Sequence, residues 1–346
     1  MKMNLYKKLF ESLKVKGQLD ISKNAKKKKK LVYYLPEEYE FVKKIYGSDK
    51  EHVELNPLPH FPLRIRFQTF NTCNASCVFC PNEKIRGTFP VQKLDFEVFK
   101  KVVNESLEYR VRRMTPFLMN EPFCDPELEE YLSYLDEIRK KNKKDYKITF
   151  VTNGFLMNRE RAQNIIECGV DNIQISIHSL KKENYEMIMK PLKLEKVLEN
   201  IDQLISLKSR LNVNHPSITI VIVVNKHNKP ELDDMINYWS KRKVKIKISS
   251  LENRGDLEIT AKGINTGCWN PMNHCLHLFR QFHILSNGDV CLCCVDWERK
   301  HIIGNVTRES VKEIWHGDKI TEIRRKYLRR DLAGLHCEKC RIEDNE

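Results

Sequence analysis

Short apolar segments alternate with longer amphipathic segments through the middle of the chain. The apolar segments are rich in Ile, Val and Phe, which favours β-strands. The amphipathic segments repeat apolar residues every three or four positions, which favours α-helices. The predicted strands are Leu63–Phe70, Met114–Met119, Ile148–Thr152, Asn172–Ile177, Ile218–Val224 and Val244–Ser249. The predicted helices are Asp95–Tyr109, Pro126–Lys141, Arg159–Cys168, Leu194–Leu207 and Glu231–Lys241.

Strands that alternate with helices predict a parallel sheet with right-handed crossovers, and therefore an α/β fold. The six predicted strands fall short of the eight in a complete barrel. The sequence therefore predicts a partial (β/α)6 TIM-like barrel over residues 61–255. In such folds ligands bind at the carboxyl ends of the strands, so the residues that follow each strand are the candidates for a site.

The two ends of the chain have a different character. Residues 1–60 are expected to form a separate leader segment, with an exposed turn at Lys26–Lys30 and a short helix at Leu35–Tyr46. Three prolines, Pro57, Pro59 and Pro62, precede the first strand. Residues 256–346 hold seven of the 12 cysteines and are expected to form a small C-terminal domain.

Composition narrows the class of protein. Twelve cysteines in 346 residues, without an apolar signal region or a membrane-length segment, indicate metal binding in a reducing cytoplasm rather than disulfides. The net charge of +14 is attributed to solvated lysines. The alternative is attraction to an acidic partner, such as a nucleotide-linked sugar, an acidic peptide or RNA. No basic run is interleaved with aromatics as in single-strand binders, so nucleic acid is not an expected partner.

Three cysteines, Cys73, Cys77 and Cys80, follow the first predicted strand directly. Iron–sulfur cubanes are usually held by four thiolates, so three ligands leave one iron open. The run resembles the CxxxCxxC signature of the radical S-adenosylmethionine (SAM) superfamily. The resemblance implies a [4Fe–4S] cluster whose open iron chelates SAM, and a 5′-deoxyadenosyl radical that abstracts hydrogen from substrate. The alternative is structural zinc, for which His60 and Cys124 are the nearest additional ligands but lack the usual spacing.

Four later strand ends carry motifs that the same resemblance interprets as SAM contacts. Met119-Asn120-Glu121-Pro122 is similar to the GGEP motif that contacts the SAM amino group, with two glycines replaced. Thr152-Asn153-Gly154 resembles the TNG turn. For Asn120-Glu121-Pro122 the alternative is an ordinary turn. For His178 the alternative is a buried histidine whose hydrogen bonds are satisfied within the protein. The cofactor-binding residues that the resemblance implies are Phe79, Asn120, Glu121, Asn153, Ser176, His178 and Asn225.

The last part of the chain resembles a SPASM/twitch domain, which carries auxiliary iron–sulfur clusters in relatives. It contains a hairpin signal at Ser286–Val290, a helix around Val311–Trp315 and a terminal CxxC. The resemblance implies one auxiliary [4Fe–4S] cluster. A four-cysteine zinc ribbon is the alternative, and Cys291 or Cys294 could replace Cys293 as a ligand. The implied ligands are Cys275, Cys293, Cys337 and Cys340.

The resemblance to the radical SAM superfamily also implies the reaction expected below and makes two residues candidates for its substrate chemistry. Asp296 is a candidate base, with a turn aspartate as the alternative. Cys268 is a candidate hydrogen donor, with an inert buried thiol as the alternative. The expected reaction removes hydrogen from an unactivated carbon of a small polar, sugar-like or peptide substrate. Oxidation or cross-linking, with a flavodoxin- or ferredoxin-type electron donor, competes with epimerisation. A zinc-stabilised binding protein is the alternative outside the enzymes.

Overall fold

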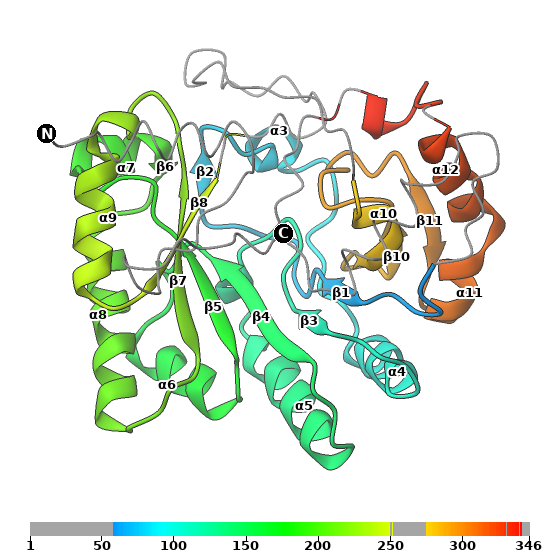
Figure 1. Ribbon diagram of the computed structural model, residues 1–346, viewed down its shortest axis with the longest axis horizontal. Coiled ribbons are helices and arrows are strands. Elements are labelled where there is room, and N and C mark those ends of the chain that lie inside the picture. Colours follow the sequence, from blue (N-terminus) through cyan, green and yellow to red (C-terminus); the bar gives the residue numbers. More distant parts are fainter. Residues whose placement is uncertain (1–57, 250, 252–274, 330, 339, 341–346) are drawn as a thin grey trace, which may run out of the picture.

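The computed structural model describes residues 58–249, 251, 275–329, 331–338 and 340. Six parallel strands lie side by side in chain order, which confirms the predicted α/β architecture. The strands are β1 (Arg64–Phe67), β3 (Arg113–Thr115), β4 (Lys147–Thr152), β5 (Asn172–Ser176), β7 (Ser217–Val223) and β8 (Lys245–Ser249). The helices between them are α4 (Phe96–Ser106), α5 (Leu128–Lys141), α6 (Arg159–Glu167), α8 (Leu194–Arg210) and α9 (Leu232–Lys241). Figure 1 shows α8 and α9 at one end of the molecule.

Local signals set the helix starts. The Asp95 carboxylate accepts hydrogen bonds from the backbone N–H groups of Glu97 and Val98, so it caps α4. Asn158 caps α6 in the same way through the N–H of Arg161. These side chains satisfy donors that a helix leaves unpaired at its first turn, which explains why the helices begin at these positions.

The two faces of the sheet differ in polarity. Along β5, Ile173 and Ile175 are completely buried in the core that the helices share, whereas Asn172, Gln174 and Ser176 are half-buried on the opposite face. Side chains alternate between faces along a strand, so period-two patterning separates an apolar outer face from a polar inner face. The polar face is the inner wall of the partial barrel and the surface available to ligands.

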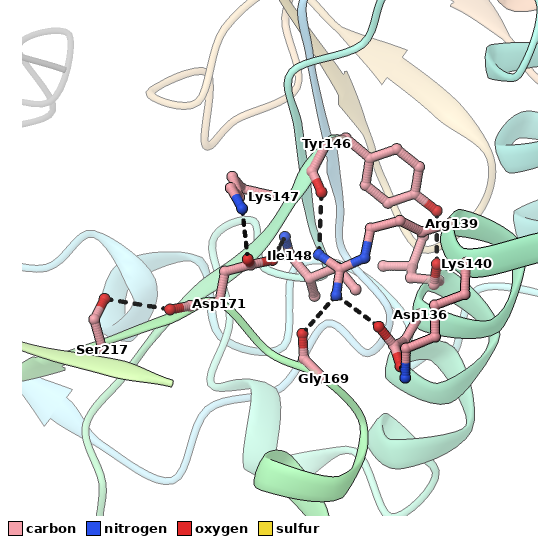
Figure 2. A network of polar contacts seen from close by, with 10 residues as sticks. Asp136, Arg139, Lys140, Tyr146, Lys147, Ile148, Gly169, Asp171 and Ser217 are labelled. Atoms are coloured by element: carbon pink, nitrogen blue, oxygen red, sulfur yellow. Dashed lines mark hydrogen bonds and ion pairs between the residues drawn. The ribbon is translucent and has the colours of Figure 1, made fainter. Parts of the chain in front are cut away.

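A half-buried arginine joins the carboxyl-terminal half of α5 to the segments that precede β4 and β5 (Figure 2). Arg139 of α5 donates to the carboxylate of Asp136 at 2.6 Å and to the carbonyls of Gly169 at 2.9 Å and Tyr146 at 3.1 Å. It also forms an ion pair with Asp171, which precedes β5. Gly169 has φ +65°, and an added Cβ would lie 2.3 Å from Asp136 Oδ1. The turn therefore requires glycine.

The C-terminal strands continue the same sheet. β9 (Gln281–Ile284) pairs parallel with β1, and β10 (Asp289–Cys291) pairs antiparallel with β9 through the predicted hairpin, which has Gly288 at φ +81°. β11 (Ile302–Asn305) completes a nine-stranded sheet. The helices α11 (Val311–His316) and α12 (Asp318–Leu328) follow, and Figure 1 shows them at the end of the molecule opposite α8 and α9. No pattern in the sequence predicts the β1–β9 pairing.

Several short helices and strands were not predicted from the sequence, because segments of a few residues are too short to show a helical or strand repeat of apolar positions. They are β2 (Ser76–Cys77), α3 (Asn82–Ile85), η1 (Pro122–Cys124), α7 (Lys182–Ile188), β6 (Met189–Lys190), η2 (Lys229–Glu231), α10 (His277–Arg280) and η3 (His336–Glu338). The predicted helix Leu35–Tyr46 and the candidate Cys268 lie outside the described residues. Within the described part of the chain, the helices are all too short or too polar to cross a bilayer.

Candidate cofactor sites

The loop that carries Cys73, Cys77 and Cys80 leaves the carboxyl end of β1 and is fixed from several sides. Its short strand β2 pairs antiparallel with β6, so that Cys77 lies opposite Met189. The Arg86 guanidinium donates to the carbonyl of Ala75 at 2.8 Å. These bonds hold the backbone between the cysteines and so fix where the thiols can point.

The thiols are half-buried and close enough to influence one another. Burial raises the pKa of Cys73 and Cys77 well above its usual value, and the neighbouring thiols and Glu121 raise it further. Thiolates so placed require a cation to compensate their charge. A metal or cluster at this loop would supply it.

The spread of the thiols discriminates between zinc and a larger cluster. Tetrahedral zinc, with Zn–S bonds of about 2.3 Å, holds its sulfur ligands about 3.8 Å apart. Among the described residues, only His277, Cys293 and Cys294 form a group of three or more metal-ligating atoms that lie within 4.8 Å of one another. Cys73, Cys77 and Cys80 do not form such a group, so at least two of their sulfurs lie farther apart than one zinc ion requires, which is compatible with a multinuclear cluster.

Glu121 joins the carboxyl ends of β3 and β4. Its carboxylate accepts hydrogen bonds from the Thr152 hydroxyl at 2.5 Å, the Asn153 N–H at 2.7 Å and the Phe123 N–H at 3.2 Å. Burial raises its pKa to about 7, although these three donors act to lower it. The Asn153 amide donates in turn to Asn74 Oδ1 in the cysteine loop at 2.7 Å. The motifs after three successive strands thus form one bonded unit.

The residues before Glu121 take an unusual backbone shape. Met119 has φ +53°, a left-handed conformation that glycine adopts without strain. The glycines of the motif that this run resembles are absent, yet the backbone bends in the way that a glycine permits. The buried Asn120 side chain accepts from the Leu118 N–H at 2.9 Å, which stabilises the bend.

His178 and Phe79 lie together, with their ring centroids 5.0 Å apart in an edge-to-face arrangement. Nδ1 of His178 accepts the Val223 N–H at 3.2 Å, so the ring proton of the neutral imidazole lies on Nε2. Burial lowers the pKa of His178 to about 3, which keeps the ring neutral. Only the Nε2 proton could contact a ligand, as a hydrogen-bond donor.

The other two expected SAM contacts differ in access. Ser176 is half-buried at the end of β5 on the inner face. Asn225 is fully buried, and its side chain bonds within its own turn, accepting from the His227 N–H at 2.9 Å and donating to the Val223 carbonyl. The geometry thus leaves Ser176 accessible to a ligand, whereas the described contacts of Asn225 are those of a loop-stabilising residue.

The four cysteines expected at the auxiliary site converge although they are far apart in sequence. Cys275 and Cys293 are buried in one apolar cluster with Phe279 and Tyr327, and Cys337 and Cys340 pack against it. The backbone N–H of Cys275 donates to the Tyr327 hydroxyl at 2.7 Å.

Two neighbours of this group bear on its ligand assignment. Cys294 packs against the same cluster, and its Sγ lies 3.8 Å from Nδ1 of His277, a residue that sequence reasoning missed. The sequence does contain a signal for His277 as a ligand: the run Cys275-Leu276-His277 is a Cys-x-His pair. Cys291 belongs to a different apolar cluster, so Cys293 and Cys294 are the better ligand candidates.

Asp296 is completely buried in a polar turn. Its carboxylate accepts from the N–H groups of Lys300 at 2.9 Å and His301 at 2.8 Å, and it lies 3.0 Å from Nε2 of His336. Burial alone would raise its pKa, but these donors lower it. These contacts favour the turn interpretation, because Asp296 ties the loop after Cys293 to the segment that begins the CxxC.

A single apolar layer lies against both cysteine groups. It is a buried cluster that includes Leu118, Met119 and Trp297, and both Cys80 and Cys294 pack against it. The expected SAM-cluster loop, through Cys80, and Cys294, which adjoins the expected ligand Cys293, therefore contact the same apolar layer.

Two family models match the chain. The model of the radical SAM superfamily matches residues 67–238, and that of the SPASM iron–sulfur cluster-binding domain matches residues 275–341. The chain belongs to the radical SAM superfamily. Its radical SAM domain binds a [4Fe–4S] cluster and SAM, and its SPASM domain binds auxiliary iron–sulfur clusters. This membership favours an enzyme over a zinc-stabilised binding protein.

Relatives of this radical SAM enzyme carry different names. It is 26% identical over 211 residues to a probable GTP 3′,8-cyclase of Methanosarcina mazei, covering 59% of each chain. It is 23% identical over 167 residues to a tungsten-containing aldehyde ferredoxin oxidoreductase cofactor-modifying protein of Pyrococcus furiosus, covering 48% of this chain and 45% of that one. The chain spans less than two thirds of the length of these relatives.

Solved structures share its fold. Streptococcus suis SuiB bound to precursor peptide SuiA has a TM-score of 0.61 at 14% identity, covering 98% of this radical SAM enzyme and 81% of SuiB. BtrN in complex with AdoMet and 2-DOIA has a TM-score of 0.52 at 15% identity, covering 80% and 92%. At these identities the similarity establishes the fold alone.

Replacing Glu121 with glutamine should destabilise this radical SAM enzyme by about 1–3 kcal/mol. An amide offers one acceptor oxygen where the carboxylate offers two, so either Thr152 or Asn153 loses its partner in a buried site. The denaturation midpoint in urea measures the loss. Glu127→Gln is the control, since Glu127 is half-exposed and pairs with Lys93 on the surface. Equal midpoints for the two variants would contradict the linking role of Glu121.

Proposed function

We propose that this enzyme abstracts a hydrogen atom from an unactivated carbon of a small polar or peptide substrate and oxidises or cross-links the product. The observation that carries the proposal is the bonded unit at the strand ends: the cysteine loop, Glu121 and the Thr152–Gly154 turn. When bound, the cluster and SAM supply the radical that starts the reaction. The protein's own residues bind and orient these groups and the substrate, and they exclude water from the site.

Cys73, Cys77 and Cys80 would hold the SAM cluster, since three thiols on one fixed loop leave an iron for SAM. Glu121 would meet the SAM amino group, because its carboxylate accepts only three hydrogen bonds and retains acceptor capacity. Asn120, Asn153 and Ser176 lie at the same edge of the sheet. His178 would offer its Nε2 proton, and Phe79 an apolar face. Asn225 would act by holding the loop after β7.

Cys275, Cys293, Cys337 and Cys340 would hold one auxiliary [4Fe–4S] cluster. Four thiolates saturate such a cluster, which suits electron transfer better than substrate binding. The apolar layer that contacts Cys80 and Cys294 supports electron transfer between the two sites. A flavodoxin- or ferredoxin-type protein would be the electron donor. Twelve thiols in 346 residues support a reducing, cytoplasmic location.

Epimerisation is the second candidate reaction, and Cys268 is its proposed hydrogen donor. Asp296 is the proposed base for the first candidate, oxidation. The contacts of Asp296 give it less support as a base than as a turn residue. The names of the relatives add a third possibility, nucleotide cyclisation of the kind that GTP 3′,8-cyclase denotes. The barrel and both cysteine groups are compatible with each of the three.

Anaerobic purification followed by iron, sulfide and SAM-cleavage assays tests the proposal. About eight irons per chain and reductive release of 5′-deoxyadenosine are expected for two [4Fe–4S] clusters. Zinc in their place, or no SAM cleavage by the iron-loaded protein, would reject the function. Reaction in deuterated water separates the outcomes: solvent deuterium on carbon without net oxidation selects epimerisation, and none selects oxidation or cross-linking.

A further inference from the structure

The charged residues of the barrel strands all have one sign. β1, β3, β4 and β8 contain lysine or arginine, β5 and β7 contain no charged residue, and none of the six contains aspartate or glutamate. The basic residues are Arg64, Arg66, Arg113, Lys147, Lys245 and Lys247. A random distribution over the chain, which has 61 basic and 47 acidic residues, would place both signs in these strands.

All of these basic side chains lie on the inner face. In β8, Ile246 and Ile248 are buried in the helix-covered core, so Lys245 and Lys247 point to the opposite side. In β1, Ile65 is buried in the same core and Arg66 alternates with it. Because side chains alternate with period two, the basic residues share the polar wall of the barrel.

The strand register places two of them beside the proposed SAM site. Lys247 lies opposite Val221, which lies opposite Ser176, so these three residues form one row across β8, β7 and β5. Strands are spaced about 4.8 Å apart, so the Lys247 and Ser176 backbones lie about 10 Å apart. Lys245 occupies the next row towards the amino-terminal end, with Thr219 and Gln174.

We propose that Lys245 and Lys247 bind an anionic group of the substrate, a phosphate or a carboxylate, on the inner wall of the barrel. This inference rests on the proposed function, because it places the substrate next to SAM. Both lysines are half-buried, where a charge attracts a counter-ion more strongly than in bulk water. The backbone of Lys245 pairs in the β7–β8 ladder, but its side chain makes no hydrogen bond or ion pair with another described residue. Lys247 and Arg66 have further interactions, so the argument rests on charge sign and position.

Calorimetric titration of the cluster-loaded, SAM-bound enzyme tests this site with two probes, inorganic pyrophosphate and citrate. At least one should bind the wild type, and the stronger binder identifies phosphate or carboxylate as the preferred group. Lys245→Gln combined with Lys247→Gln should weaken binding of that probe by about tenfold or more. Lys147→Gln is the matched control: its side chain is 63% exposed and pairs with Asp171 at the far end of the same face, so affinity should be unchanged.

Several outcomes would overturn the inference. Failure of both probes to bind the wild type, or equal affinity in wild type and double variant, removes the anion site. An equal loss of SAM affinity in the double variant would assign the lysines to the cofactor instead. If the double variant does not load its clusters, the salt dependence of probe binding to the wild type decides, since affinity should fall steeply with salt. Absence of SAM cleavage by the wild type would reject the proposed function separately.

Discussion

Alanine at Cys73, Cys77 and Cys80 together should remove about four irons per chain and reduce SAM cleavage to background. The three thiols come from one loop fixed by β6, Arg86 and Asn153, so no other described cysteine can take the place of all three. Iron analysis and the cluster absorption and EPR spectra report the loss independently of activity. The auxiliary cluster should remain, because its proposed ligands lie in a different apolar cluster.

The reciprocal variant is the control for this prediction. Cys337→Ala with Cys340→Ala should remove the other group of about four irons and leave the SAM-dependent cluster signal in place. SAM cleavage should survive in this variant while turnover of substrate stops. SAM cleavage that survives the triple change, or loss of all iron in both variants, would contradict two separate sites.

Arg139→Met should cost about 3–5 kcal/mol of unfolding free energy. The Arg139 side chain is 14% exposed, and its guanidinium compensates the carboxylates of Asp136 and Asp171 while donating to two backbone carbonyls (Figure 2). Methionine fills a similar volume but leaves these groups unpaired in a partly dry site. The urea midpoint, at unchanged slope, measures the effect. Lys140→Met is the control, since Lys140 is 71% exposed and also pairs with Asp136; its cost should be below about 1 kcal/mol.

The ion pair between Arg139 and Asp171 predicts that the stability of the protein depends on pH. Burial by itself would raise the pKa of Asp171, but the Ile148 N–H, Lys147 and Arg139 donate to the carboxylate and lower its pKa. A lowered folded-state pKa means stability that is present above the unfolded-state value of about 3.9 and is lost as the pH falls below it. The difference between wild type and Arg139→Met should therefore be largest above about pH 4 and shrink on further acidification. A difference that grows on acidification would contradict the ion pair.

Strand and helix order was predictable because each barrel element is long enough to show its own period. The β4 run Lys147–Thr152 and the α8 run Leu194–Arg210 fall close to the predicted ranges. The predicted strand at Met114–Met119 extends too far, since β3 ends at Thr115 and the chain then bends at Met119. An apolar run does not reveal a left-handed residue that interrupts it.

The candidate site was predictable in position but not in detail. Motif order along the chain placed Cys73, Glu121 and Asn153 at neighbouring strand ends, and the structure places them there. What the sequence could not supply was the bonding between them. Hydrogen bonds such as that from the Asn153 amide to Asn74 span 79 positions, and no local pattern encodes such a contact. His277 was missed for the same reason, because its value as a ligand depends on Cys294, 17 residues away.

The parallel pairing of β1 with β9 has a consequence for how the protein can be divided. β1 forms ladders with β3 on one side and β9 on the other, so its backbone groups on both sides are used. A fragment ending before residue 275 would expose a ladder of unsatisfied amides and carbonyls on the strand that presents the first cysteine loop. An unpaired strand edge of this kind promotes strand pairing between molecules. The barrel is thus not a detachable module, and dissection of the two cofactor halves is better done by point substitution than by truncation.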